Sequence, residues 1–372
     1  MRLERVEMKV LARIFVFSTA CLAASAGTFE DLAAQAAAAR EANNVPKAIE
    51  LYQQALQLKP AWTEGWWFLG TLSYDSDQYK TGEHAFSEFV KLDEKVAMAW
   101  GFLGLCEFET GEHEPALEHI RRGLAIGSGI EPAIEQVLRF HEVLLLTKLG
   151  LFDQAMPKLM PFVRRGVKNQ ALLSVIGLTA LRQAHMPGEV PVGEQALIDA
   201  AGRAAYLWMA GDAGGTQPAF KELLDNYPRA PGVHYLYASY LLSFRPAEEA
   251  FAEFKRELEV NPHSADARAT IALLMVRAGA SSAALPLARQ AAQDGPTCPM
   301  AQYAYGLILA GTGDFKEAID RLERAERLDP SSIEYHMGLA GVYSNAGRYE
   351  DARRERRTSI ALAKESDSSG AP

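Results

Sequence analysis

The sequence predicts an all-α protein built from repeated helical hairpins, and three observations support this fold class. Pro228, Pro262, Pro296 and Pro330 follow one another at intervals of 34 residues, a period typical of stacked helical repeats. The chain contains 60 alanines, and alanine has the highest helix propensity and lets helices approach closely. Apolar residues make up 48% of the 372 residues and charged residues 23%, so the chain can bury a core.

The period can be followed through most of the chain as repeats of two helices and one turn. Within a repeat, positions 4, 7, 11, 20, 24 and 27 lie on inward stripes at helical spacing. Small residues at positions 8 and 20 allow the two helices to touch, and glycine at position 15 suits a turn with positive φ. A proline near position 32 follows the end of the second helix. We expect repeats to start at Phe29, Thr63 and Ala97, near Gln136, Gln170 and Leu197, and at Pro231, Ala265, Pro299 and Ile333.

This pattern resembles the tetratricopeptide repeat family over residues 29–362. The resemblance implies a right-handed α-solenoid of about nine to ten helix-turn-helix repeats. Because no repeat can bury its apolar face alone, its stability would come from stacking on its neighbours. The repeat core residues that the resemblance indicates are Trp66, Gly70, Trp100, Gly104, Ala116, Ala238, Ala250, Ala272, Ala284, Gly306, Ala318, Ala340 and Ala352.

The period is interrupted twice in the middle of the chain. About five residues are inserted around Gly127–Pro132, and the segment 184–196 contains prolines that disfavour a regular second helix. We therefore expect N-terminal repeats over 27–183, an irregular linker over 184–196 and C-terminal repeats over 197–362. Residues 363–372 are polar and are expected to form a disordered tail.

The first 26 residues have the features of a secretory signal peptide. A basic start is followed by a short apolar run, and Ala24-Ser25-Ala26 provides small residues for cleavage after Ala26. The start can be Met1 or Met8, and the alternatives to cleavage are an uncleaved anchor or lipidation at Cys21. Removal of this segment changes the formal charge from −9 to −11. The expected location is therefore the periplasm of a bacterium or the outside of the cell.

No catalytic or metal-binding motif stands out. His141-Glu142 lacks the second histidine of a zinc protease motif, and His113 and His119 are six residues apart without a further ligand at suitable spacing. The glycine-rich stretch 211–215 lacks the lysine of a phosphate loop. We expect no catalytic residues, no metal and no cofactor. A net acidic chain without a long basic stretch is also a poor candidate for nucleic-acid binding.

The family resemblance further implies a concave groove lined by positions 2, 5, 9, 12 and 13 of the first helices. A groove rich in aromatic side chains suits a peptide or partner protein better than a charged small molecule. The alternative is that these aromatic rings pack between helices. The candidate groove residues are Trp67, Tyr74, Phe108, Trp208, Tyr235 and Tyr303.

Together these features predict a non-catalytic scaffold or adaptor of the bacterial periplasm or envelope, with a protein or peptide partner. One alternative is an envelope lipoprotein subunit of an assembly or secretion complex, anchored at Cys21. Another is an enzyme or carbohydrate-binding module that uses the irregular segments 127–136 and 184–196.

Overall fold

The computed structural model describes residues 28–369, and nearly all of its regular structure is α-helical. The chain divides into two compact units, Met1–Leu149 and Gly150–Pro372, which are described separately. Residues 1–27 and 370–372 lie outside the described part, and so do the predictions about the signal peptide and Cys21. None of the helices in residues 28–369 is long and apolar enough to cross a membrane.

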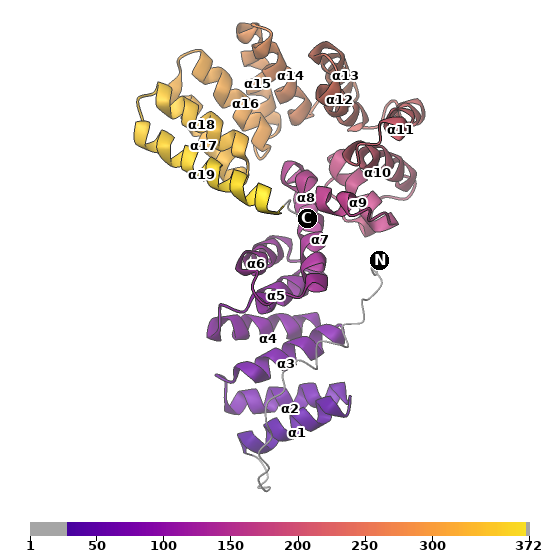
Figure 1. Cartoon of the computed structure of the whole chain (residues 1–372), viewed down its shortest axis with the longest axis vertical. Coiled ribbons are helices and arrows are strands. Elements are labelled where there is room, and N and C mark those ends of the chain that lie inside the picture. Colours follow the sequence, from indigo (N-terminus) through magenta and orange to yellow (C-terminus); the bar gives the residue numbers. More distant parts are fainter. Residues whose placement is uncertain (1–27, 370–372) are drawn as a thin grey trace. The chain divides into compact units, whose positions relative to one another are not determined.

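The N-terminal unit consists of helical hairpins stacked in chain order (Figure 1). Within each hairpin, the first and second helices of one repeat pack against each other. The second helix then contacts the first helix of the next repeat. The helices are α1 (Phe29–Glu41), α2 (Val45–Leu58), α3 (Thr63–Asp75), α4 (Tyr79–Leu92), α5 (Ala97–Thr110), α6 (His113–Ile126) and α7 (Pro132–Lys148).

The C-terminal unit continues with twelve α-helices and one 3₁₀ turn within its described residues, 150–369. Its regular hairpins are α12 with α13, α14 with α15, α16 with α17, and α18 with α19. The helices are α8 (Phe152–Arg164), α9 (Gln170–Ala180), α10 (Gln195–Met209), α11 (Ala213–Asn226), α12 (Val233–Phe244), α13 (Ala247–Val260), α14 (Ala265–Arg277), α15 (Ser281–Asp294), α16 (Pro299–Gly311), α17 (Phe315–Leu328), α18 (Ile333–Asn345) and α19 (Tyr349–Ser369).

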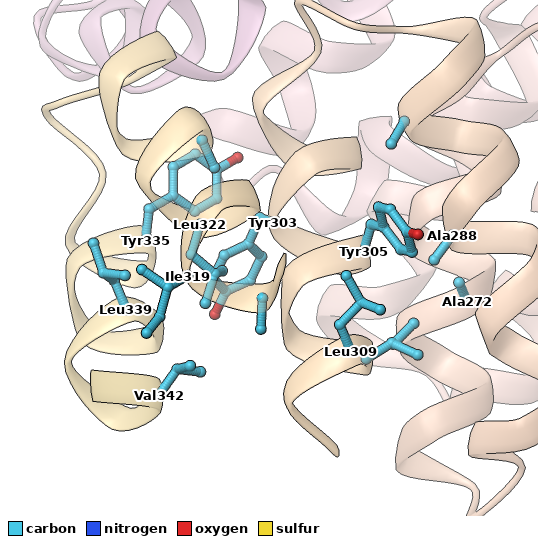
Figure 2. Close-up of a cluster of buried hydrophobic side chains, with 14 of the residues drawn as sticks. Ala272, Ala288, Tyr303, Tyr305, Leu309, Ile319, Leu322, Tyr335, Leu339 and Val342 are labelled. Carbon is cyan, nitrogen blue, oxygen red and sulfur yellow. The ribbon is translucent and has the colours of Figure 1, made fainter. Parts of the chain in front are cut away.

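In each regular hairpin, a small residue of the first helix allows close contact with the second helix. A Cβ added at Gly306 would lie 2.7 Å from Cγ of Leu322 and 3.0 Å from the carbonyl oxygen of Ala318. All thirteen predicted repeat core residues are buried in the structure. Figure 2 shows the resulting core between α14 and α18, where Tyr303, Tyr335 and Leu339 interleave with the alanines and leucines of neighbouring helices.

The turn between the two helices of a repeat has the same backbone conformation at position 15 in most repeats. Eight repeats place a residue with positive φ there, and the non-glycine examples, Asn43 and Asp77, are of types that tolerate this conformation. The eight residues are Asn43, Asp77, Gly111, Gly150, Gly211, Gly279, Gly313 and Gly347. Arg182 has the same conformation two residues earlier in its repeat, with φ of 56°.

A second repeated interaction joins the first helix of six repeats to the connection before it. The side chain at position 4 bonds to the carbonyl oxygen six residues earlier, and it is a tryptophan, a histidine, an arginine or a glutamine. Donor–acceptor distances run from 2.7 to 3.3 Å, apart from the Arg268 pair. The pairs are Trp66 with Pro60, Trp100 with Glu94, His234 with Pro228, Arg268 with Pro262, Gln302 with Pro296, and His336 with Pro330.

The middle of the chain departs from the expected boundaries. Helix α7 starts at Pro132 instead of near Gln136, because proline is well tolerated in the first turn of a helix. Helix α10 starts at Gln195 and packs against α9, so it takes the place of the second helix that the prolines of 184–196 exclude. Gly177 and Gly202 allow this contact, since a Cβ at either position would lie 2.1 Å from a carbonyl oxygen of the other helix.

Two expected divisions also differ from the structure. The boundary between the compact units falls after Leu149, and the irregular segment 184–196 lies within the C-terminal unit. Helix α19 continues to Ser369, which corrects the disordered tail expected from residue 363. The residues Ala361, Ala363 and Lys364 have high helix propensity, and this favours continuation of the helix.

The close approach inside a hairpin predicts opposite effects of the same substitution at two mid-helix glycines of the C-terminal unit. A Cβ at Gly341 would meet no atom within 4 Å, so Gly341→Ala should stabilise the protein by about 0.5–1 kcal/mol through helix propensity. Gly306→Ala should destabilise it, because the added carbon meets Ala318 and Leu322. Urea denaturation would measure both changes, and an equal stabilisation by the two substitutions would contradict the assigned helix contact.

Candidate functional site

The candidate groove residues of the N-terminal unit contribute to packing between helices. Trp67 is half-buried, and its ring lies 5.7 Å from that of Phe89 and 6.1 Å from that of Phe102. The Tyr74 ring lies 5.4 Å from that of Phe102. Burial raises the pKa of the Tyr74 hydroxyl well above its usual value. These two rings therefore join α3, α4 and α5 and leave only part of their surface to solvent.

Helix α7 covers part of the surface of α5 that the family resemblance assigns to the groove. The Phe108 ring lies 4.7 Å from the His141 ring of α7, nearly perpendicular to it. Leu105 is 2% exposed, and a Cβ at Gly101 would lie 2.7 Å from the Leu138 side chain. Phe108 therefore has a partner within the same unit.

Tyr303 requires a correction. It is 5% exposed, its ring lies 4.8 Å from that of Tyr335, and Gly338 packs closely against it. Figure 2 shows Tyr303 and Tyr335 in this core. Position 5 of the α16 repeat therefore belongs to the core in this chain. The alternative expectation, that some of these aromatic residues pack between helices, applies to Tyr303.

Tyr235 lies beside an arginine of the chain itself. The Arg182 guanidinium is 5.1 Å from the Tyr235 ring and 5.2 Å from the Phe152 ring. It donates two hydrogen bonds to Asp153 at 2.9 and 3.2 Å and two to Asp266 at 2.9 and 2.6 Å. Asp266 and Tyr235 occupy positions 2 and 5 of consecutive repeats, which are groove positions of the family. This part of the expected groove is thus filled by Arg182.

The charges of this Arg182 cluster are mostly screened from water. The Arg182 side chain is 15% exposed, and those of Asp153 and Asp266 are 33% and 17% exposed. Burial raises the pKa of the Asp153 carboxyl, but the guanidinium outweighs burial and holds that pKa below its usual value. For the more buried Asp266, burial outweighs the guanidinium and raises the pKa. The cluster links α8, the end of α9, α12 and α14.

An open groove lies elsewhere in the C-terminal unit, between α11 and the α12–α13 hairpin. It has a volume of about 670 Å³. The connection before α12 spans six residues, whereas those before α14, α16 and α18 span four, and the longer connection lets α12 stand away from α11. The residues of this α11–α13 groove are Gln217, Pro218, Lys221, Leu224, Asp225, Tyr237, Tyr240, Leu241, Arg245 and Glu249.

Aromatic rings line one wall of the α11–α13 groove. The Tyr240 ring stacks on that of Phe220 at 4.7 Å, and it is 5.9 Å from Trp208 and 5.5 Å from Phe244. Phe244 is 66% exposed, and Trp208 is half-buried. Rigid aromatic side chains next to a groove are typical anchors of protein interfaces. Of the six candidate residues, Trp208 is the one that adjoins this groove.

The described residues offer little for a metal or a reactive thiol. Residues 28–369 contain no group of three or more His, Cys, Asp or Glu side chains that could hold a metal ion. Burial raises the pKa of the Cys106 thiol, and the Cys298 thiol donates to Asp266 at 3.1 Å. Asp212, in the glycine-rich stretch 211–215, caps the start of α11 by accepting from the Gly215 amide.

Sequence reasoning missed Arg182 and most of the α11–α13 groove. Arg182 pairs with Asp266, 84 residues away, and no local spacing indicates such a pair. The sequence does contain a pattern that indicates the groove. Tyr237, Tyr240 and Phe244 follow a spacing of i, i+3 and i+7, which places three aromatic side chains on one face of α12.

Comparison with protein families shows where the repeat pattern is strongest. Models described as "Tetratricopeptide repeat" match residues 69–129 and 269–333 in one case and 309–358 in another. The matched residues include the predicted repeat starts Ala97, Pro299 and Ile333, and they also cover most of the repeats that start at Thr63 and Ala265. Both compact units are therefore represented. No curated protein matches the chain.

Several solved structures resemble the chain at low identity. MamA from Desulfovibrio magneticus RS-1 is 19% identical, covering 44% of this chain and 92% of its own, with a TM-score of 0.36. YrrB, described as a TPR protein with an unusual peptide-binding site, is 18% identical, covering 43% and 82%, with a TM-score of 0.33. Yeast Tom70 is 15% identical, covering 89% and 68%, with a TM-score of 0.34. At these TM-scores the similarities carry no argument about a binding site.

The Arg182 cluster predicts a large effect of one substitution. Arg182→Ala leaves two acidic side chains without their shared cation and should destabilise the protein by about 3–5 kcal/mol. Arg203→Ala is the matched control, because Arg203 and Glu222 form a 3.5 Å pair whose side chains are 52% and 53% exposed. It should cost about 0–1 kcal/mol. Urea denaturation followed by circular dichroism compares the two, and equal effects would mean that the cluster contributes no more than a surface pair.

Proposed function

Because the chain belongs to the tetratricopeptide repeat family, we propose that it is a non-catalytic scaffold or adaptor that binds a partner protein through the α11–α13 groove. We further propose that it works in the bacterial periplasm or envelope. The observation that carries the binding proposal is the open groove beside the exposed ring of Phe244 and the half-buried ring of Trp208.

The groove also differs from the other family surfaces of the C-terminal unit. Tyr303 is buried, and Tyr235 contacts Arg182, so neither ring is free to take a ligand. Around Tyr240, by contrast, aromatic and aliphatic side chains face a space of about 670 Å³. Such a space can accept the apolar side chains of a helix or an extended peptide. This supports the α11–α13 groove as the partner site.

The rim of the groove carries both signs of charge. Arg245 directly follows α12, Glu249 lies in the first turn of α13, and Lys221 pairs with Asp225 along α11. A mixed rim around an aromatic wall is the usual arrangement at a protein interface, where the rim excludes water and the centre provides affinity. The partner is therefore expected to present an apolar surface with polar edges.

The location proposal rests on the first 26 residues, with their basic start, apolar run and Ala24-Ser25-Ala26. Expression of the full chain in a Gram-negative host should give a periplasmic protein whose mature sequence starts at Gly27. Cell fractionation and N-terminal sequencing measure this outcome. A cytoplasmic protein with an intact N-terminus would contradict it, and fatty-acid labelling that is lost in Cys21→Ser would favour the lipoprotein alternative.

The binding proposal predicts that an exposed ring beside the groove is needed for partner capture. Phe244→Asp should abolish recovery of the specific partner in pull-downs from envelope extracts, because it places a charge at the aromatic wall. Tyr349→Asp is the control, since Tyr349 is 64% exposed on α19 and Phe244 is 66% exposed. Quantitative mass spectrometry compares the two variants with the unmodified chain. Equal recovery with Phe244→Asp and the unmodified chain would refute the groove assignment.

A further inference from the structure

His234 stands between two hydrogen-bond acceptors next to the α11–α13 groove. Its Nδ1 lies 2.7 Å from the Glu253 carboxylate and its Nε2 lies 3.0 Å from the Pro228 carbonyl oxygen. The histidine is 7% exposed and Glu253 is 7% exposed. A carbonyl oxygen can only accept, and so can an ionised carboxylate, so both contacts are hydrogen bonds only when both ring nitrogens carry protons.

The same position in neighbouring repeats carries side chains that hold the bond without titrating near neutral pH. Arg268 donates to Pro262 and is permanently charged, whereas Gln302 donates to Pro296 at 3.3 Å and is neutral. In the His234 repeat, a neutral ring has only one N–H, so the bond to Pro228 and the bond to Glu253 exist together only after proton uptake. His336 repeats the geometry in α18, with Glu355 at 2.8 Å and the Pro330 oxygen at 3.0 Å.

The hydrogen bond from His234 to Pro228 restrains the connection between α11 and α12, whose length separates the two helices at the groove. Pro228 lies in the six-residue connection between α11 and α12, and Tyr237 and Tyr240 of α12 line the groove. The rings of Tyr237 and Tyr240 are 6.1 Å apart, and Tyr240 is 5.9 Å from Trp208. A change in the bond from His234 to Pro228 would therefore move the connection from which α12 and its aromatic wall begin.

The charged groups around His234 favour its protonated form. Glu253 and Glu257 of α13 are acidic neighbours, and Arg256 pairs with the second oxygen of Glu253. The hydrogen bond that His234 donates to Glu253 raises the pKa of His234 above its ordinary value, with burial opposing it. A raised pKa means that the stabilisation is complete below about pH 6.5, the value of an unfolded histidine, and is lost as the pH rises through the folded value.

We propose that protonated His234 holds the α11–α12 connection in place through its two hydrogen bonds, and that its protonation state thereby regulates the shape of the α11–α13 groove. The proposal rests on the proposed function only in treating the groove as the partner site. With a doubly protonated ring, the connection is tied to α12 and α13 together. After loss of one proton, the remaining N–H stays with the stronger acceptor, the Glu253 carboxylate, so the bond to the Pro228 oxygen breaks and the connection is less firmly held.

Thermal melts from pH 5.5 to 8.5 test the stabilising part. His234→Gln keeps a donor to Pro228, as Gln302 does to Pro296, but removes the titration. The melting temperature of the unmodified chain should exceed that of His234→Gln at pH 5.5, and this difference should shrink by about 2–4 °C at pH 8.5. His263→Gln, at a site whose side chain is 84% exposed, should give a constant difference. A constant difference for His234→Gln as well would overturn the proposal.

Fluorine NMR tests the effect on the groove without any partner. Of the five tryptophans, Trp208 is the one in the C-terminal unit, and in protein labelled with 5-fluorotryptophan its signal can be assigned with Trp208→Phe. This signal should shift with pH in the unmodified chain and in His336→Gln, and lose that shift in His234→Gln. A shift unchanged in His234→Gln would overturn the proposal, whereas a failed pull-down with Phe244 intact would overturn only the proposed function.

Discussion

The close approach of two helices at small residues is the constraint on which the rest of the structure depends. Where Gly306 meets Ala318 and Leu322, no Cβ fits, and the equivalent positions of the other regular repeats carry glycine or alanine. This contact sets the spacing of each hairpin, and the position 4 hydrogen bond then joins the hairpin to the preceding connection. Helix contacts of this kind account for the many alanines that are buried in residues 28–369.

These constraints are local, so much of the fold could be read from the sequence. The expected repeat starts at Phe29, Thr63, Ala97 and Ala265 coincide with observed helix starts. Helix pairing in the middle could not be read in this way. The prolines of 184–196 excluded a second helix correctly, but the recruitment of α10 to that place depends on the contact between Gly177 and Gly202, which are separated by a long loop.

The candidate site was harder to predict from the sequence. The 34-residue period describes the features that the repeats share, whereas the site depends on features that single repeats do not share. Tyr235 occupies a groove position, yet its surroundings depend on Arg182, which comes from the irregular segment. The α11–α13 groove arises from a connection that is two residues longer than its counterparts. Both features are departures from the repeat. They place the inner surface near Tyr235 in contact with the chain itself and leave the aromatic wall near Tyr240 open.

The central claim is that the C-terminal unit contacts its partner at the α11–α13 groove and not along the regular face of the repeats. Site-specific photo-crosslinking in living cells tests it most directly, with a benzoylphenylalanine placed at Phe244 in one strain and at Met337 of α18, which is 51% exposed, in another. The account predicts a defined crosslinked partner from position 244 and none from position 337. The same crosslink from position 337, or none from position 244 while the partner still co-purifies, would contradict it.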